Sequence, residues 1–233
     1  MQVQHPFGVV TPTLDGDVLT VLAGADADFT PPQVHAILAS RSVEGVRKAL
    51  QRLSDEGIVT ASRHGHAVLY RLNRQHVAAD AVLALSRLRT TLIERISARI
   101  ATWPTPPVAA VMFGSAATGQ MRHDSDIDLF VVRSDTVAAD EPGWTDQLRD
   151  LEASVTAWTG NDTRILEYAQ HDLAVAEHDP VLDDIAAEGV MVFGEIPKRS
   201  GSQGGAQRTK DQAVRRSGTA RPDGQSRTVR RRG

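Results

Sequence analysis

The stretch that decides the fold is "FGSAATGQMRHDSDIDLFVV", residues 113–132, in which a Gly-Ser pair stands ten residues ahead of an Asp-Ile-Asp triplet. An apolar run follows the triplet and is expected to form a buried strand. Side chains two residues apart in a strand share a face, so Asp126 and Asp128 should converge. Like charges this close repel each other unless a cation neutralises them, and Mg²⁺ prefers carboxylate oxygen with phosphate completing its shell. The triplet therefore predicts a metal site.

The Gly-Ser pair predicts the other half of the same site. Gly114 and Ser115 follow the apolar run "VAAVMF" and precede an expected helix from about Ala116. Backbone amides and a hydroxyl at such a junction suit phosphate oxygens. A phosphate-binding turn beside paired carboxylates predicts a nucleotide site.

The spacing of these two motifs resembles the signature of the minimal nucleotidyltransferases, a branch of the DNA polymerase β superfamily, which is Gly-Ser, ten residues, then Asp-x-Asp. The resemblance extends over about residues 107–196. Four residues match the signature without a gap, and four flanking residues are also similar to the family: Gly114, Ser115, Asp126 and Asp128, with Gly119, Ser125, Ile127 and Leu129.

The resemblance implies that a nucleoside monophosphate, AMP in the first instance, passes from ATP or another nucleoside triphosphate to an acceptor hydroxyl, with two Mg²⁺ ions. It assigns Asp126, Asp128 and a third carboxylate as metal ligands and catalytic residues, and Ser115 and the amides near Gly114 as the phosphate contacts. Glu167 in "TRILEY" is the candidate third carboxylate; the alternative is a surface residue paired with Arg164. Thr118 and Gln120 stand where relatives often carry a basic and an acidic residue, so contacts to the triphosphate are expected to differ here.

Apolar runs and helical patterns alternate along residues 104–197. Strands are expected at "VAAVMFGS", "DIDLFVV", "TRILEY" and "GVMVFGE", with helices between them, including "GWTDQLRDLEASVTAWTG". This order predicts an α/β domain of about 90 residues.

Residues 15–73 predict three helices and a hairpin. Thr30, Pro31 and Gln33 form a helix start, and Val43, Val46, Leu50 and Leu53 recur at helical spacing before Gly57. Two β-prone runs flank "RHGH". The pattern resembles winged helix-turn-helix domains of bacterial regulators, whose third helix enters the major groove. The resemblance assigns DNA contacts to Arg47, Lys48, Gln51 and Arg63; the alternative is a module for dimerisation or protein docking.

The remaining segments are an arm (1–14), a connecting helix (74–103) and a basic tail (198–233). In the connecting helix, Val82, Leu85, Leu88, Leu92, Ile96 and Ile100 recur at spacings of 3 and 4. This stripe is expected to pack within the chain or on a second copy in a homodimer. The tail holds 11 Lys and Arg against 2 Asp and is poor in apolar residues, so it predicts disorder.

The composition predicts a cytoplasmic protein. Cysteine is absent, so disulfides and thiolate zinc sites are excluded. No apolar run approaches the roughly 18 residues of a membrane span, and the start resembles no secretory leader.

Three functions from different classes follow. The first is an active nucleotidyltransferase that modifies a protein hydroxyl, as minimal nucleotidyltransferase antitoxins do to partner toxins. The second is a transcriptional regulator that binds DNA and uses the α/β domain as a nucleotide sensor. The third is a small-molecule enzyme of the aminoglycoside nucleotidyltransferase type.

Overall fold

Three helices and a β-hairpin make up the N-terminal part of the chain, in the order expected from the sequence. The computed structural model describes residues 1–39, 42–176 and 179–197, and the expected disordered tail, residues 198–233, lies outside them. The elements of the N-terminal part are η1 (Pro6–Val9), α1 (Leu14–Ala23), α2 (Pro31–Leu38), α3 (Val43–Asp55), β1 (Val59–His64) and β2 (Ala67–Leu72).

Local sequence signals set the ends of these elements. The Thr30 hydroxyl accepts a hydrogen bond from the Gln33 amide, and the Gln33 side chain accepts one from the Thr30 amide, so the capping box is confirmed. The strands β1 and β2 pair antiparallel through His64 and Ala67, around a turn that starts at Gly65. A two-way backbone bridge adds Phe29 beside Tyr70. Buried apolar residues of α1, α2, α3 and the hairpin form one cluster, the N-terminal cluster.

The connecting segment is two helices and not the single helix expected. α4 (Ala79–Ser86) and α5 (Leu88–Ala101) are separated at Arg87, whose φ of −98° and ψ of 9° interrupt the helix. The apolar spacing continues through the break, which is why the sequence predicted one helix. Val82 of α4 belongs to the N-terminal cluster, whereas Ile96 and Ile100 of α5 are fully buried in a different cluster. Within the described residues, no helix has both the length and the apolar content to cross a membrane.

A four-stranded mixed sheet forms the rest of the described chain, and the expected alternation of strands and helices is confirmed. Its strand order is β5-β4-β3-β6; β4 and β5 run parallel, and the other neighbours are antiparallel. The elements are β3 (Ala109–Phe113), α6 (Gly114–Thr118), β4 (Ile127–Arg133), α7 (Pro142–Thr159), β5 (Thr163–Ala169), α8 (Gln170–Val175), α9 (Pro180–Glu188) and β6 (Val190–Gly194).

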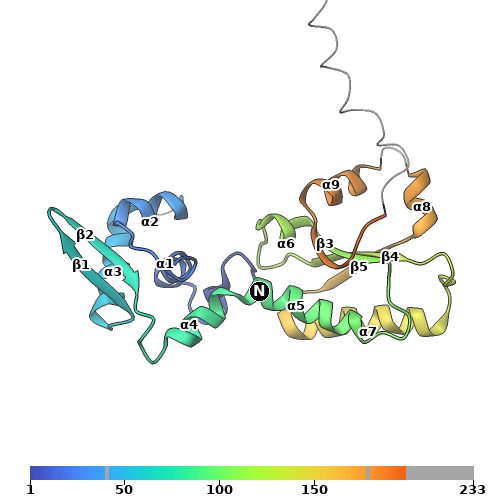
Figure 1. Ribbon diagram of the computed structural model, residues 1–233, viewed down its shortest axis with the longest axis horizontal. Helices are drawn as coiled ribbons and strands as arrows, with labels where there is room; N and C mark the ends of the chain where they lie inside the picture. Colours follow the sequence, from blue (N-terminus) through green and yellow to red (C-terminus); the bar gives the residue numbers. More distant parts are fainter. Residues whose placement is uncertain (40–41, 177–178, 198–233) are drawn as a thin grey trace, which may run out of the picture. The chain divides into compact units, whose positions relative to one another are not determined.

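Helices cover both faces of this sheet (Figure 1). On one face, α5 and α7 pack on alternate strand residues such as Ile127, Leu129 and Val131, and this set is the α5–α7 cluster. On the other face, α9 packs on the intervening residues, including Phe130 and Val132, and this set is the α9 cluster. Burial on both faces explains why β4 is a continuous apolar run once its carboxylates are passed.

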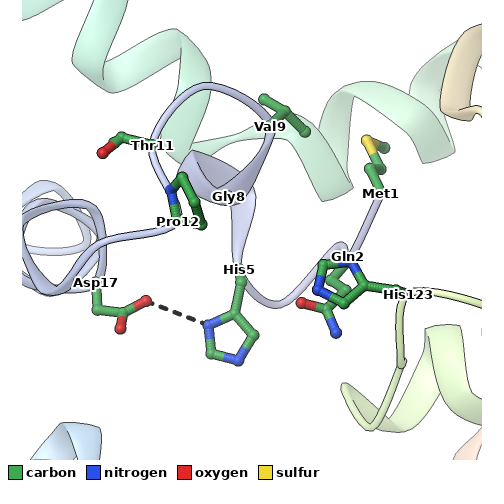
Figure 2. A pocket seen from close by; sticks show the side chains of 9 residues that line it. All are labelled: Met1, Gln2, His5, Gly8, Val9, Thr11, Pro12, Asp17 and His123. Carbon is green, nitrogen blue, oxygen red and sulfur yellow. Dashed lines mark hydrogen bonds and ion pairs between the residues drawn. The ribbon is translucent and has the colours of Figure 1, made fainter.

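The N-terminal arm is tied to the loop that precedes β4. The side-chain amides of Gln2 and Gln4 donate to the Met121 carbonyl at 3.0 and 2.8 Å, and Val3 is buried in the α5–α7 cluster. Residues of the arm, Asp17 of α1 and the exposed His123 line a hollow of about 270 Å³ (Figure 2). The arm therefore contributes to the order of the loop on which Asp126 stands.

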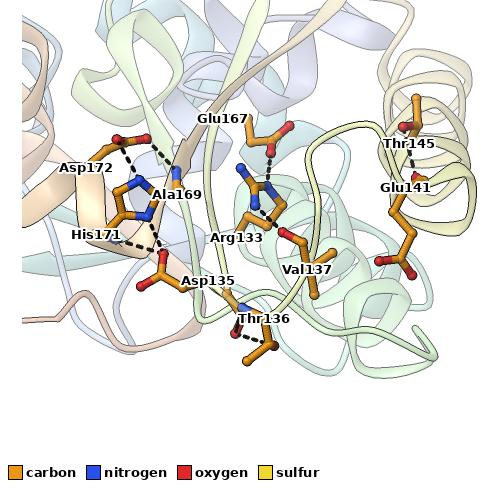
Figure 3. Close-up of polar contacts among 11 residues, drawn as sticks. Arg133, Asp135, Thr136, Val137, Glu141, Thr145, Glu167, Ala169, His171 and Asp172 are labelled. Carbon is orange, nitrogen blue, oxygen red and sulfur yellow. Dashed lines mark hydrogen bonds and ion pairs between the residues drawn. The ribbon is translucent and has the colours of Figure 1, made fainter.

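At the carboxyl end of the parallel strands, His171 at the start of α8 joins the loop after β4. Its Nδ1 lies 2.6 Å from an Asp135 oxygen and its Nε2 lies 3.3 Å from an Asp172 oxygen (Figure 3). The hydrogen bond to Asp135 raises the pKa of His171, with Asp172 adding to the rise, and the same bond lowers the pKa of Asp135. This pair is exposed and lies beyond the carboxyl end of β4, whereas the Asp-x-Asp motif lies at the start of that strand, so we regard it as a structural contact.

We expect the His171 pKa, followed by proton NMR, to lie above its ordinary value and to fall back in Asp135→Asn. A raised pKa means that the stabilisation from this contact is complete below about pH 6.5 and is lost as the pH rises through the folded-state pKa. Asp146→Asn is the control, because Asp146 pairs with Arg149. An equal effect of both substitutions on the His171 titration would contradict the assignment.

Candidate nucleotide site

The start of β4 places the two carboxylates of the motif at the centre of the sheet. Asp126 immediately precedes the strand, and Asp128 lies opposite Phe113 on β3 and opposite Arg164 on β5. Both carboxylate residues are half-buried. The expected convergence is therefore supported by the backbone, because the two residues lie two apart and point to the same face of β4.

The turn between β3 and α6 closes one side of this pair. Gly114 has a φ of +65°, and a Cβ atom built on it would lie 2.8 Å from the Asp128 Oδ2 atom. A glycine here lets the backbone approach the carboxylate and adopt a conformation that L side chains rarely adopt. α6 has only five residues, so its helix dipole is small. The groups available for phosphate contacts are the backbone amides of the turn and the half-buried hydroxyl of Ser115.

Arg164 closes the other side. Its Nη2 atom lies 2.8 Å from the Asp126 Oδ2 atom. Burial raises the pKa of the Asp128 carboxyl, the negative charge of Asp126 raises it further, and Arg164 opposes both effects. Arg164 was not among the site residues predicted from the sequence. The signal was strand alternation, because Arg164 and Glu167 are three residues apart on β5 and cannot share a face, so at most one of them can lie beside Asp128.

The loop before Asp126 is fixed by contacts that the sequence did not indicate. The Asn161 side-chain amide donates to the Ser125 carbonyl at 2.8 Å, and the Ile127 amide donates to the Asp162 carbonyl at 2.8 Å. Asn161 is buried and its side-chain oxygen accepts from the Met1 amine. These bonds hold the "TGND" turn against the motif.

Glu167 is not brought together with Asp126 and Asp128. It lies opposite Val131, three residues along β4 from Asp128, which corresponds to about 10 Å. Alternation puts Glu167 on the face covered by α5 and α7, and Asp128 on the opposite face. The partner of Glu167 is Arg133, whose Nε lies 2.6 Å from its Oε1 and which also donates to the Val137 carbonyl (Figure 3). The alternative pairing with Arg164 is not found either.

The donor set decides which metal this site suits. Asp126 and Asp128 supply hard carboxylate oxygens, the ligands that Mg²⁺ prefers alongside phosphate. Throughout residues 1–39, 42–176 and 179–197, no group of three or more histidine, aspartate or glutamate side chains is placed to hold a metal ion. The two carboxylates therefore suit an ion whose remaining ligands come from a nucleotide, and they do not form the expected three-carboxylate set.

A second surface carries the predicted DNA contacts. Arg47, Lys48 and Gln51 are exposed on α3, and Arg63 is exposed on β1. Gln51 donates to Asp55 at 2.7 Å, and Arg47 lies 3.7 Å from Glu44. A hollow of about 590 Å³ is lined by residues of α2, α3 and the hairpin, including Arg47, Lys48 and Gln51. The structure groups three of the four residues around one hollow, and Arg63 is not among its lining residues.

Residues 98–195 match the family model described as "Polymerase beta, Nucleotidyltransferase". The match contains β3 to β6 and both motifs, so the comparison supports a nucleotidyltransferase domain in residues 98–195. A solved structure described as "Crystal structure of the toxin-antitoxin with AMP-PNP" is 16% identical, with a TM-score of 0.33, over 44% of this chain and 73% of that chain.

Another solved structure, described as "Structure of TrmBL2, an archaeal chromatin protein, shows a novel mode of DNA binding", is 14% identical. Its TM-score is 0.24, over 74% of this chain and 71% of that chain. No curated protein matches the chain.

We expect Gly114→Ala to weaken nucleotide binding far more than Gly160→Ala. Both glycines have positive φ, 65° and 71°, so both substitutions cost about 1 kcal/mol of folding free energy. A methyl group at position 114 also displaces the Asp128 carboxylate, whereas nothing lies within 4 Å of a Cβ at position 160. Thermal unfolding and calorimetric titration with a non-hydrolysable ATP analogue and Mg²⁺ separate the two effects. Equal affinities in the two variants would contradict the placement of Gly114 in the site.

Proposed function

We propose that this protein is a nucleotidyltransferase that transfers a nucleoside monophosphate from a nucleoside triphosphate, with ATP as the first candidate, to an acceptor hydroxyl. The observation that carries the proposal is the close approach of the Gly114 turn to Asp128, with Asp126 beside it. A phosphate-binding turn and a carboxylate pair then face the same place. The family match over residues 98–195 supports the same class of reaction.

In this reaction the Gly114–Ser115 turn and the Asp126–Asp128 pair have different roles. Ser115 and the amides of the turn would bind the β- and γ-phosphates. Asp126 and Asp128 would hold Mg²⁺, which would neutralise phosphate charge and polarise the bond to be broken. The acceptor oxygen forms a bond to the α-phosphorus, and its proton passes to water. The bond to the β-phosphate breaks and pyrophosphate leaves with the electron pair. Positioning and charge compensation account for most of the catalysis in such a step.

The nature of the acceptor separates the candidate enzymes. A protein hydroxyl corresponds to an antitoxin-like enzyme acting on a partner toxin, and a small-molecule hydroxyl corresponds to the aminoglycoside type. The described residues place no acidic side chain of β5 beside the pair to act as a base for the acceptor, because Glu167 is bound to Arg133. Activation of the acceptor then depends on Asp126, Asp128 and their metal, or on a group that the acceptor's own protein supplies.

We expect label from α-labelled ATP and Mg²⁺ to appear on a protein or small molecule in a host lysate with the wild type and to be absent with Asp126→Ala/Asp128→Ala. Loss of both carboxylates removes the metal ligands, so transfer should fall by at least about 100-fold. Asp146→Ala, which removes an exposed carboxylate from α7, is the control. γ-Labelled ATP should give no label that differs between the wild type and Asp126→Ala/Asp128→Ala, because that phosphate leaves in pyrophosphate. A γ-label that depends on the two carboxylates would indicate a kinase and contradict the proposal.

We propose DNA binding as a second function, located on the exposed surface of α3. The supporting observation is that Arg47, Lys48 and Gln51 lie together around one hollow beside the hairpin. Arginine and lysine can bind phosphate or guanine, and glutamine can bind adenine. A regulator that binds DNA here would use the nucleotide site as a sensor or as an enzyme.

We expect Arg47→Ala/Lys48→Ala to lower affinity for duplex DNA, because each substitution removes a cation that can neutralise a phosphate. The salt dependence of binding should also fall, by about one unit of slope for each phosphate that is no longer neutralised. Arg52→Ala is the control on the same helix, because Arg52 pairs with Asp15 at 2.9 Å. Fluorescence anisotropy at several salt concentrations measures both quantities, and a chain ending at Pro197 separates out the basic tail. Unchanged affinity in the double variant would exclude α3 as the DNA surface.

A further inference from the structure

Arg164 is the residue of β5 that lies beside the Asp126–Asp128 pair. It lies directly opposite Asp128 in the parallel pairing of β4 and β5. By strand alternation it shares the face of Asp128. Its Nη2 atom is 2.8 Å from Asp126. A side chain at this position therefore reaches the carboxylate pair, and in this chain that side chain is a cation.

The acidic residue of the same strand is held elsewhere. Glu167 lies on the opposite face and contacts Arg133 with little exposure, since the two side chains are 25% and 13% exposed. Bringing Glu167 to Asp128 would require β5 to shift by an odd number of residues, which would also move Ile165 out of the α5–α7 cluster and Leu166 out of the α9 cluster. The pairing seen here is thus fixed by the packing on both faces.

The charge of the site follows from these placements. Two ionised carboxylates and one guanidinium give a net charge of about −1, whereas three carboxylates would give about −3. One divalent cation can bind both carboxylates and complete its shell with oxygens of the triphosphate. A second divalent cation would have to share the same two carboxylates, one of which already contacts Arg164.

We propose that Arg164 is a built-in cation of the nucleotide site, which restricts the Asp126–Asp128 pair to a single divalent ion and binds a phosphate of the nucleotide once that ion takes its place on Asp126. The inference rests on the proposed nucleotidyltransferase function and specifies how its site holds metal and substrate. The Arg164 side chain is 73% exposed, so its ion pair is weak enough to be exchanged. A guanidinium matches the geometry of phosphate as well as that of carboxylate.

The experiment measures the stoichiometry and affinity of metal binding, so it does not require the acceptor to be known. Mn²⁺ is titrated into the protein with and without a non-hydrolysable ATP analogue, and free Mn²⁺ is read from its electron paramagnetic resonance signal. The variants are Arg164→Ala, Arg164→Lys and Arg164→Glu. Arg149→Ala is the matched control, since Arg149 is also 73% exposed and pairs with an aspartate. Thermal unfolding checks that each variant is folded.

The expected result is one Mn²⁺ per chain in the wild-type complex with the analogue. Without the analogue, Arg164→Ala should bind Mn²⁺ about fivefold to tenfold more tightly, because a neighbouring positive charge is removed. It should also bind the analogue less tightly. Arg164→Lys should stay close to the wild type, and Arg164→Glu should take up a second Mn²⁺.

The outcomes distinguish this inference from the proposed function. Two Mn²⁺ ions in the wild-type complex, or an Arg164→Ala variant that behaves like Arg149→Ala, would overturn the role of Arg164 and leave the nucleotide site intact. A wild-type protein that binds neither Mn²⁺ nor the analogue would overturn the proposed function, and the role of Arg164 with it.

Discussion

The repulsion between Asp126 and Asp128 is the constraint on which the arrangement of the sheet domain depends. Half-burial of like charges raises the pKa of Asp128, so the pair is tolerated only where cations are near. The fold places the pair at the start of β4, with the backbone of Gly114 on one side and the guanidinium of Arg164 on the other. Beyond the carboxylates, apolar side chains pack on both faces of β4 and fix its position. The desolvation and repulsion of the two carboxylates therefore affect only the start of this strand.

The two faces of the sheet carry different kinds of polar contact. The face covered by α5 and α7 carries the Glu167–Arg133 pair and the contact to Val137, which fasten the loop after β4. The other face carries Asp128 and Arg164 at the same level of the sheet. Glu167 therefore lies on the strand next to the motif, but on the face of the sheet that is covered by α5 and α7 and not on the face of Asp128.

The sequence was most informative where one local rule determines the outcome. The capping box at Thr30, the turn at Gly65 and the strand after Asp126 each follow from short-range chemistry, and the structure confirms them. The Gly-Ser and Asp-x-Asp spacing likewise predicted the domain family. The position of Glu167 could not be predicted, because it depends on the pairing register between two strands. The ties from Gln2, Gln4 and Asn161 could not be predicted either, since they join residues more than 30 positions apart.

The interruption at Arg87 has a consequence for how related chains can vary in length. Each residue added to a helix turns everything after it by about 100°. An insertion inside α5 would rotate Ile96 or Ile100 out of the α5–α7 cluster. At Arg87 the helix is already interrupted, and the apolar side chains before and after it belong to different clusters. An extra residue at this point would leave the apolar side chains of α4 in the N-terminal cluster and those of α5 in the α5–α7 cluster. Length differences among homologues should accumulate at this joint and be rare within the helices that flank it.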